Sequence, residues 1–190
     1  MQKILLSPDP VELAVKIRQW AGELGFGQVG FSRPDLGEHG RHLQHWLARG
    51  FHGDMTYMAA HGEKRWQPAS LVEGTRSLIS VRMDYLVEPP PRRKVPCEPE
   101  MAVVSRYARG RDYHKTLRKR LQQLADRIQT LAAGSGHRVF VDSGPVLERA
   151  VAYQAGLGWF GKNTMLIHRD AGSFFFLGEL FTSLDLPPDT

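Results

Sequence analysis

An amphipathic stretch from about Asp112 to Ala133 constrains the fold of this chain more than any other feature. Its apolar residues are spaced four, three, four and three positions apart, the spacing of one face of an α-helix. They are Leu117, Leu121, Leu124, Ile128 and Leu131. A long helix with a single apolar stripe needs a second layer that covers the stripe. We therefore predict a layered domain in which this helix ends at Gly134.

The rest of the chain alternates helical and β-like segments. Helices are expected over about 11–24, 39–50, 57–65 and 146–155, and strands over 26–32, 77–84, 102–107, 138–141, 164–168 and 173–180. Residues 86–100 contain five prolines and predict a loop, because proline lacks the backbone donor of regular structure. The alternation predicts an α/β (α+β) fold, a single layered domain over residues 1–190 with a mixed central sheet flanked by helices.

Composition excludes several classes of protein. A hydrophobic fraction of 42%, without the roughly 18-residue apolar run that a membrane helix needs, is typical of a soluble protein without a membrane partner. The first ten residues, MQKILLSPDP, have too short an apolar stretch for a signal peptide, so we expect a cytoplasmic protein. The only cysteine, Cys97, leaves no internal disulfide and no multi-cysteine metal site. A net charge of +5 leaves two interpretations open, a polyanionic partner such as nucleic acid or a merely basic surface.

The chemistry is predicted to lie between Val141 and Gly178. The segment VDSGP at 141–145 places Asp142 at the end of an apolar strand, where α/β folds commonly place their sites. In an apolar pocket this carboxyl would hold a proton near neutral pH and deliver it to a substrate. The alternative is a cap of the following helix, and the residues alone leave both open. Glu148 and Arg149, next in the chain, are expected to form an ion pair.

The glycine-rich segment GLGWFGKN at 156–163 matches two phosphate-binding patterns by its letters. Gly156, Gly158 and Gly161 satisfy G-x-G-x-x-G, and Gly156, Gly161 and Lys162 nearly satisfy the P-loop pattern. Both patterns require a preceding strand and a following helix, whereas here a helix is expected before the glycines and a β-like run after them. We therefore predict an irregular glycine loop that meets another kind of ligand.

Five motifs together resemble the epoxyqueuosine reductase family, over nearly the whole chain from Val11 to Leu184. They are HGEKR at 61–65, SRYARGRDYHKTLRKRL at 105–121, VDSGPVLERA at 141–150, AGLGWFGKNTMLI at 155–167 and AGSFFFLGEL at 171–180. The family reduces the epoxide of epoxyqueuosine at the wobble position of certain tRNAs, the last step of queuosine biosynthesis. It uses base-off cobalamin and two iron–sulfur clusters. The resemblance thus implies an oxidoreductase of tRNA modification.

The resemblance also implies roles for particular residues. Asp142 matches the family's proton donor and lies in the corrinoid site, which favours catalysis over capping. The other residues in motifs that line the corrinoid are Arg65, Ser105, Asn163, Leu166 and Leu177. DYH at 112–114 departs from the D-x-H-x-x-G signature of proteins that ligate cobalt through histidine, because Leu117 replaces the glycine. We therefore expect His114 to form hydrogen bonds or to contact phosphate, and we expect no metal ligands in the chain.

Basic residues at 106–119 become a candidate tRNA-facing surface under this resemblance. By themselves the same charges also fit a solvated helix face. The family continues into an iron–sulfur segment with eight cysteines and into helical repeats, which the 190 residues do not include. We therefore expect a truncated N-terminal part, a monomer that takes electrons from an external donor or a missing domain. The alternatives are a non-catalytic corrinoid- or tRNA-binding module or remnant, and a flavin-binding reductase.

Overall fold

The computed structural model of the chain describes residues 8–86, 100, 102 and 104–189. Its helices are α1 (Pro10–Glu23), α2 (Glu38–Ala48), α3 (Pro68–Leu71), α4 (Tyr113–Leu131) and α5 (Glu148–Gln154). Its 3-10 helices are η1 (Thr56–Met58), η2 (Gly62–Arg65) and η3 (Arg106–Ala108). Its strands are β1 (Gln28–Ser32), β2 (Ser77–Asp84), β3 (His137–Phe140), β4 (Trp159–Phe160), β5 (Leu166–Ile167) and β6 (Phe175–Thr182).

Four strands form the central sheet, in the order β1-β2-β6-β3. The long central pair runs from Ser77 opposite Thr182 to Asp84 opposite Phe175. The predicted fold class, helices flanking a central sheet, is confirmed. The three strand pairings of this sheet are all antiparallel, whereas a mixed sheet was expected. Strand β2 is buried on both faces through apolar and polar residues alike, and such burial suits either strand direction, so its sequence did not settle its pairing.

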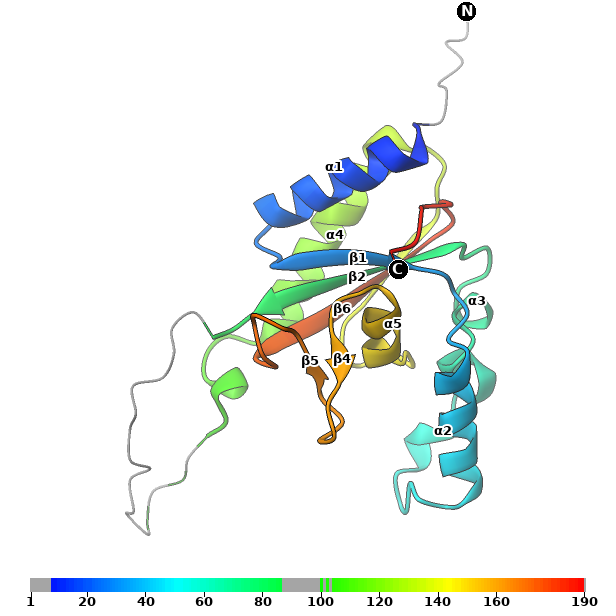
Figure 1. Ribbon diagram of the computed structural model, residues 1–190, viewed down its shortest axis with the longest axis vertical. Helices are drawn as coiled ribbons and strands as arrows, with labels where there is room; N and C mark the ends of the chain where they lie inside the picture. Colours follow the sequence, from blue (N-terminus) through cyan, green and yellow to red (C-terminus); the bar gives the residue numbers. More distant parts are fainter. Residues whose placement is uncertain (1–7, 87–99, 101, 103, 190) are drawn as a thin grey trace, which may run out of the picture.

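Helices α1 and α4 lie on one face of the sheet and α5 lies on the other (Figure 1). The stripe predicted for α4 is confirmed through its first four residues, which are fully buried in the main core cluster with Ile17 of α1 and Leu180 of β6. Leu131, the last residue of the stripe, is 40% exposed at the end of the helix. The longest helix is therefore held by the sheet and by α1.

Two glycines allow helices to approach the two faces of the sheet closely. A side-chain carbon at Gly178 would lie 2.7 Å from Leu121 of α4. At Gly30, on the opposite face, it would lie 1.9 Å from the carbonyl oxygen of Ala155, at the end of α5. The short helix α5 therefore rests directly on the backbone of β1, and this close approach fixes where α5 sits on the sheet.

Several expectations for individual elements need correction. The strand expected over 102–107 is wrong, since residues 106–108 form η3. The helical segment expected over 57–65 is reduced to the two short turns η1 and η2. The glycine segment is less irregular than expected, because β4 and β5 pair there as a small hairpin. The proline-rich loop expected over 86–100 lies outside the described residues except for its first and last positions, and Cys97 lies outside them.

Among the described residues, none of the helices is both long and apolar enough to cross a membrane.

Candidate active site

Asp142 lies just after β3, in the loop that leads to α5. Its backbone adopts a φ of 52°, in the left-handed region that residues with a side chain rarely occupy. Its side chain is 61% exposed. The described residues therefore do not enclose Asp142 in an apolar pocket, the condition under which its carboxyl was expected to hold a proton near neutral pH. The capping alternative is also wrong, because the residue before α5 is Leu147, which makes no side-chain cap bond.

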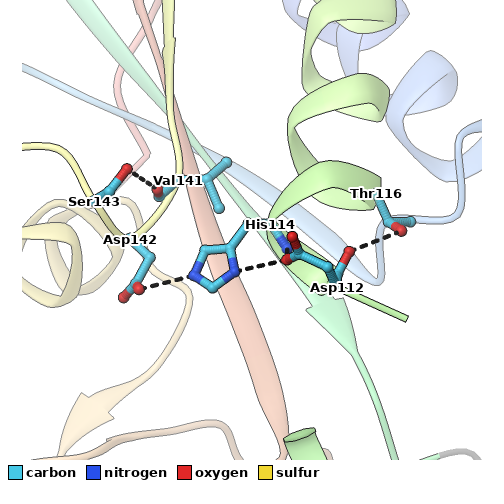
Figure 2. Close-up of polar contacts among 6 residues, drawn as sticks. All are labelled: Asp112, His114, Thr116, Val141, Asp142 and Ser143. Carbon is cyan, nitrogen blue, oxygen red and sulfur yellow. Dashed lines mark hydrogen bonds and ion pairs between the residues drawn. The ribbon is translucent and has the colours of Figure 1, made fainter. Parts of the chain in front are cut away.

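His114 connects Asp142 to Asp112 across the first turn of α4 (Figure 2). Its Nε2 lies 3.0 Å from Oδ2 of Asp142 and its Nδ1 lies 2.9 Å from Oδ1 of Asp112. The hydrogen bond to Asp142, more than the bond to Asp112, raises the pKa of His114 above its ordinary value. Protonated His114 donates to both carboxylates, so the three side chains form a chain of charge-assisted hydrogen bonds.

Aromatic packing fixes the position of this imidazole. Tyr113 stacks on His114 with the ring centroids 3.9 Å apart, and on Phe176 of β6 with the centroids 3.8 Å apart. Burial, with the nearby carboxylates of Asp142 and Glu148, raises the pKa of Tyr113 to about 12. The phenol is therefore neutral at physiological pH and stays a hydrogen-bond donor near Asp142.

Two carboxyl groups behind the loop were missed as functional candidates. Oε1 of Glu148 accepts a hydrogen bond of 2.6 Å from the backbone N–H of Asp142. Arg149 instead donates to the carbonyl oxygen of Thr164, so the expected pairing of Glu148 with Arg149 is replaced by contacts to two other segments. Burial raises the pKa of Glu148 to about 7.

Glu179 of β6 is the second of these carboxyl groups, and it is fully buried. It accepts a hydrogen bond of 2.9 Å from the hydroxyl of Ser80 on β2. Its other oxygen has no partner among the described residues. Burial, and secondarily the charge of Glu148, raise its pKa well above the ordinary value. An acidic residue inside the otherwise apolar strand FFLGELFT was the sequence signal for this group.

This arrangement is suited to moving a proton to a ligand on the exposed side of Asp142. An exposed carboxyl can reach a reacting atom, and the imidazole behind it can supply the next proton. The three side chains can therefore pass a proton from His114 through Asp142 to such a ligand.

The residues expected at the corrinoid lie on separate segments of the chain. Arg65 ends η2 and donates from its Nη2 to the carbonyl oxygen of Tyr57 at 3.0 Å. Its Nε is buried without a partner among the described residues. Burial lowers the pKa of Arg65 below its ordinary value. Ser105 precedes η3 and is exposed.

The remaining three belong to the β4–β5 hairpin and to β6. Asn163 lies in the hairpin turn, where its side-chain oxygen accepts a hydrogen bond of 3.1 Å from the backbone N–H of Met165. Leu166 is buried in a small cluster against which Leu177 packs. The structure thus brings Leu166 and Leu177 together, while Arg65, Ser105 and Asn163 belong to three other segments, which are η2, the residue before η3 and the hairpin turn.

Sequence comparison agrees with these motifs. The family model described as "Epoxyqueuosine reductase QueG, DUF1730" matches residues 65–143. An epoxyqueuosine reductase of Pseudomonas aeruginosa is 60% identical over 185 residues, which cover 97% of this chain and 51% of that protein. The chain thus spans about half the length of the curated relatives it matches.

Solved structures show the same relationship. Epoxyqueuosine reductase from Streptococcus thermophilus superposes with a TM-score of 0.80 at 28% identity, covering 95% of this chain and 48% of that one. A structure with a tRNA-Tyr epoxyqueuosine-modified stem loop gives 0.73 at 26% identity, covering 94% and 47%. A reductive dehalogenase with a B12-dependent mechanism shares the fold at a TM-score of 0.58 and 16% identity, covering 97% and 21%. In sequence and in fold, the chain is therefore similar to the epoxyqueuosine reductases, of which it fits an N-terminal part.

Proposed function

We propose that residues 1–190 form the cobalamin-binding catalytic domain of an epoxyqueuosine reductase, which reduces epoxyqueuosine to queuosine in tRNA. The exposed carboxyl of Asp142, hydrogen-bonded to His114, is the observation that carries the proposal. It supplies an acid with a proton source in a chain 60% identical to a protein of that name.

Asp142 acts as the proton donor in this proposal. Reduction of an epoxide to an alkene breaks both C–O bonds, consumes two electrons and two protons, and releases the oxygen as water. We assign to Asp142 the proton that the oxygen takes up when the first C–O bond breaks. His114 then returns a proton to the carboxylate through its Nε2, 3.0 Å away. Asp112 holds the opposite nitrogen of the ring and stabilises the imidazolium form of His114.

The described residues fit a corrinoid at its polar edge. The buried, unpartnered Nε of Arg65 needs an acceptor, and a corrinoid offers amide and phosphate oxygens around its ring. Arg65, Ser105 and Asn163 would hold this edge through polar side chains and Leu166 and Leu177 through backbone groups, while Asp142 would face the substrate. When bound, base-off cobalamin would supply the electrons. The B12-dependent mechanism of the reductive dehalogenase that shares this fold supports the choice of cofactor.

The electrons must reach the cofactor from an external donor or from a further domain. The chain has one cysteine, so clusters of the kind implied by the resemblance would take their ligands elsewhere. A tRNA stem loop is the proposed partner, as in the structure that contains one. The exposed basic residues that begin at η3 and continue along α4 are its proposed docking surface. We also propose that the protein is a cytoplasmic monomer, as the sequence and its resemblance to this family imply.

The experiment is the Asp142→Asn change in a protein that contains this chain together with its electron-transfer part. Conversion of epoxyqueuosine-containing tRNA is measured by mass spectrometry of the nucleosides. The carboxamide cannot donate a proton, so we expect turnover to fall by about 10²- to 10⁴-fold. Asp126→Asn makes the same chemical change on exposed α4 and serves as the control. Unchanged turnover in Asp142→Asn would disprove the catalytic role.

The alternative is a non-catalytic corrinoid- or tRNA-binding module. A titration of the purified chain with cob(II)alamin distinguishes the candidates. A saturable spectral change without turnover supports the binding module. No spectral change leaves tRNA binding alone, and a yellow protein that retains flavin supports a flavin-binding reductase.

A further inference from the structure

Asp142 is held through its backbone as well as through its side chain. The N–H bond to Glu148 Oε1 and the φ of 52° occur at the same residue. A residue with a side chain keeps a left-handed conformation only where surrounding contacts impose it. The bond to Glu148 is such a contact, and it joins the loop to α5.

Glu148 has a rigid support. It is the first residue of α5, whose Ala150, Val151 and Ala152 are buried against the sheet. Within the loop, the backbone bonds are short-range, from Ser143 N–H to the carbonyl oxygen of Val141 and from Val146 N–H to that of Gly144. Packing also holds the two ends of the loop, since Val141 is buried and Val146 and Leu147 pack against the core. The bond from Asp142 to Glu148 is the hydrogen bond by which the packed helix holds the backbone of Asp142 itself.

The electrostatic surroundings of Glu148 consist mainly of other carboxyls. The charge of Asp142 raises the pKa of Glu148, while His114 opposes the effect. The charge of Glu148 in turn raises the pKa of Glu179. A pair of neighbouring buried carboxyls binds protons more readily than an isolated one. Either protonation state of Glu148 leaves an oxygen that accepts the N–H of Asp142.

We propose that Glu148 is a positioning residue: its side-chain oxygen accepts the Asp142 N–H bond and so holds the Asp142 carboxylate against His114. The proposal deepens the proposed function, because the same pose presents Asp142 to the substrate. The contact between Asp142 and His114 can nevertheless be measured without any turnover.

The test measures the pKa of His114 by NMR of the imidazole resonances in the purified 190-residue chain. Asp142 raises this pKa, so it reports whether the two side chains are in contact. The variants are Glu148→Ala, which removes the acceptor, and Glu148→Gln, which loses the same charge but keeps an acceptor oxygen. Asp142→Asn defines the value without a carboxylate partner, and His114→Gln assigns the resonance.

We expect Glu148→Ala to lower the pKa of His114 at least half as far as Asp142→Asn does, and Glu148→Gln to retain most of the wild-type value. Equal values in Glu148→Ala and Glu148→Gln would overturn the proposal, because only charge would then matter. A wild-type value in Glu148→Ala, or in Asp142→Asn, would also overturn it. If the amide resonances of Glu148→Ala lack the dispersion of the folded wild-type chain, Glu148→Leu takes its place. The pKa of His114 in Glu148→Leu is then compared with the pKa in Glu148→Gln in the same way.

Turnover provides a second measurement in the longer protein. A loop displaced by about 1 Å can lower the rate about 100-fold. We expect Glu148→Ala to lower kcat to that extent with KM unchanged, and Glu148→Gln to restore it. If the wild-type protein does not convert epoxyqueuosine-containing tRNA, the proposed function fails, and the NMR comparison still decides the role of Glu148.

Discussion

A substitution at Gly30 in β1 tests most directly how closely α5 packs against the sheet. The ideal side-chain carbon of an alanine there would lie 1.9 Å from the Ala155 carbonyl oxygen, where side-chain carbons essentially never approach within 3.0 Å. Gly30→Ala must therefore separate two backbone segments by about 1 Å or more, at the end of the helix that begins with Glu148. Neither backbone can rotate away as a flexible side chain would.

Overpacking of this kind typically costs about 1–3 kcal/mol, and occasionally more. Because both contacting groups are held by the sheet and by α5, we expect the free energy of unfolding to fall by about 3 kcal/mol. For a chain of this size that corresponds to a melting temperature lower by roughly 6–12 °C. The assay is urea unfolding followed by tryptophan fluorescence and far-ultraviolet circular dichroism, with thermal melts in parallel.

Gly22→Ala is the matched control. Gly22 lies in α1, is exposed, and would bring its new carbon within 4 Å of nothing. Alanine is favoured over glycine inside a helix by about 0.5–1 kcal/mol, so this change should stabilise the chain. If Gly30→Ala unfolds at the wild-type urea midpoint with an unchanged slope, the close approach of α5 to β1 is wrong.

Two further predictions concern pH and charge. Burial raises the pKa of Glu179. Above about pH 4.5 the folded chain therefore binds more protons than the unfolded chain, and the free energy of unfolding falls as the pH rises toward the pKa of Glu179 in the folded chain. Glu179→Gln should therefore raise the melting temperature more at pH 8 than at pH 5, and an equal change at both would contradict this. Replacing exposed Lys115 and Lys119 of α4 by Gln should leave the melting temperature unchanged but weaken tRNA stem-loop binding. The slope of log affinity against log salt should fall by about 0.7–0.9 for each phosphate that is no longer neutralised, and an unchanged slope would exclude this face from the docking surface.

The sequence predicted best those elements whose local residue pattern follows directly from burial against the core. The apolar spacing in α4 reports burial directly, and α4 and β2 both formed close to the expected bounds. The segment 102–107 was misread, because a short run of mixed residues carries little periodic signal.

The candidate site was predictable only in part. The position of Asp142 after a strand was predictable, because that position and its motif are local features, while its catalytic role stays a prediction. Its partner His114 lies 28 residues earlier in the chain, and no local pattern joins the two. Glu148 was expected to pair with its neighbour Arg149, and only packing showed that it binds the Asp142 backbone instead.

The sequence by itself determined the layered class, the long helix that the sheet must cover, and the identity of the acid at the end of β3. Periodicity and composition suffice for these, because burial acts on each residue through its own side chain. The tertiary structure alone decided the antiparallel pairing of the strands and the close packing of α5 against Gly30. It also decided the hydrogen bonds that the backbone N–H and the side chain of Asp142 form. These depend on distances between residues far apart in the chain, which only the packed sheet and helices establish.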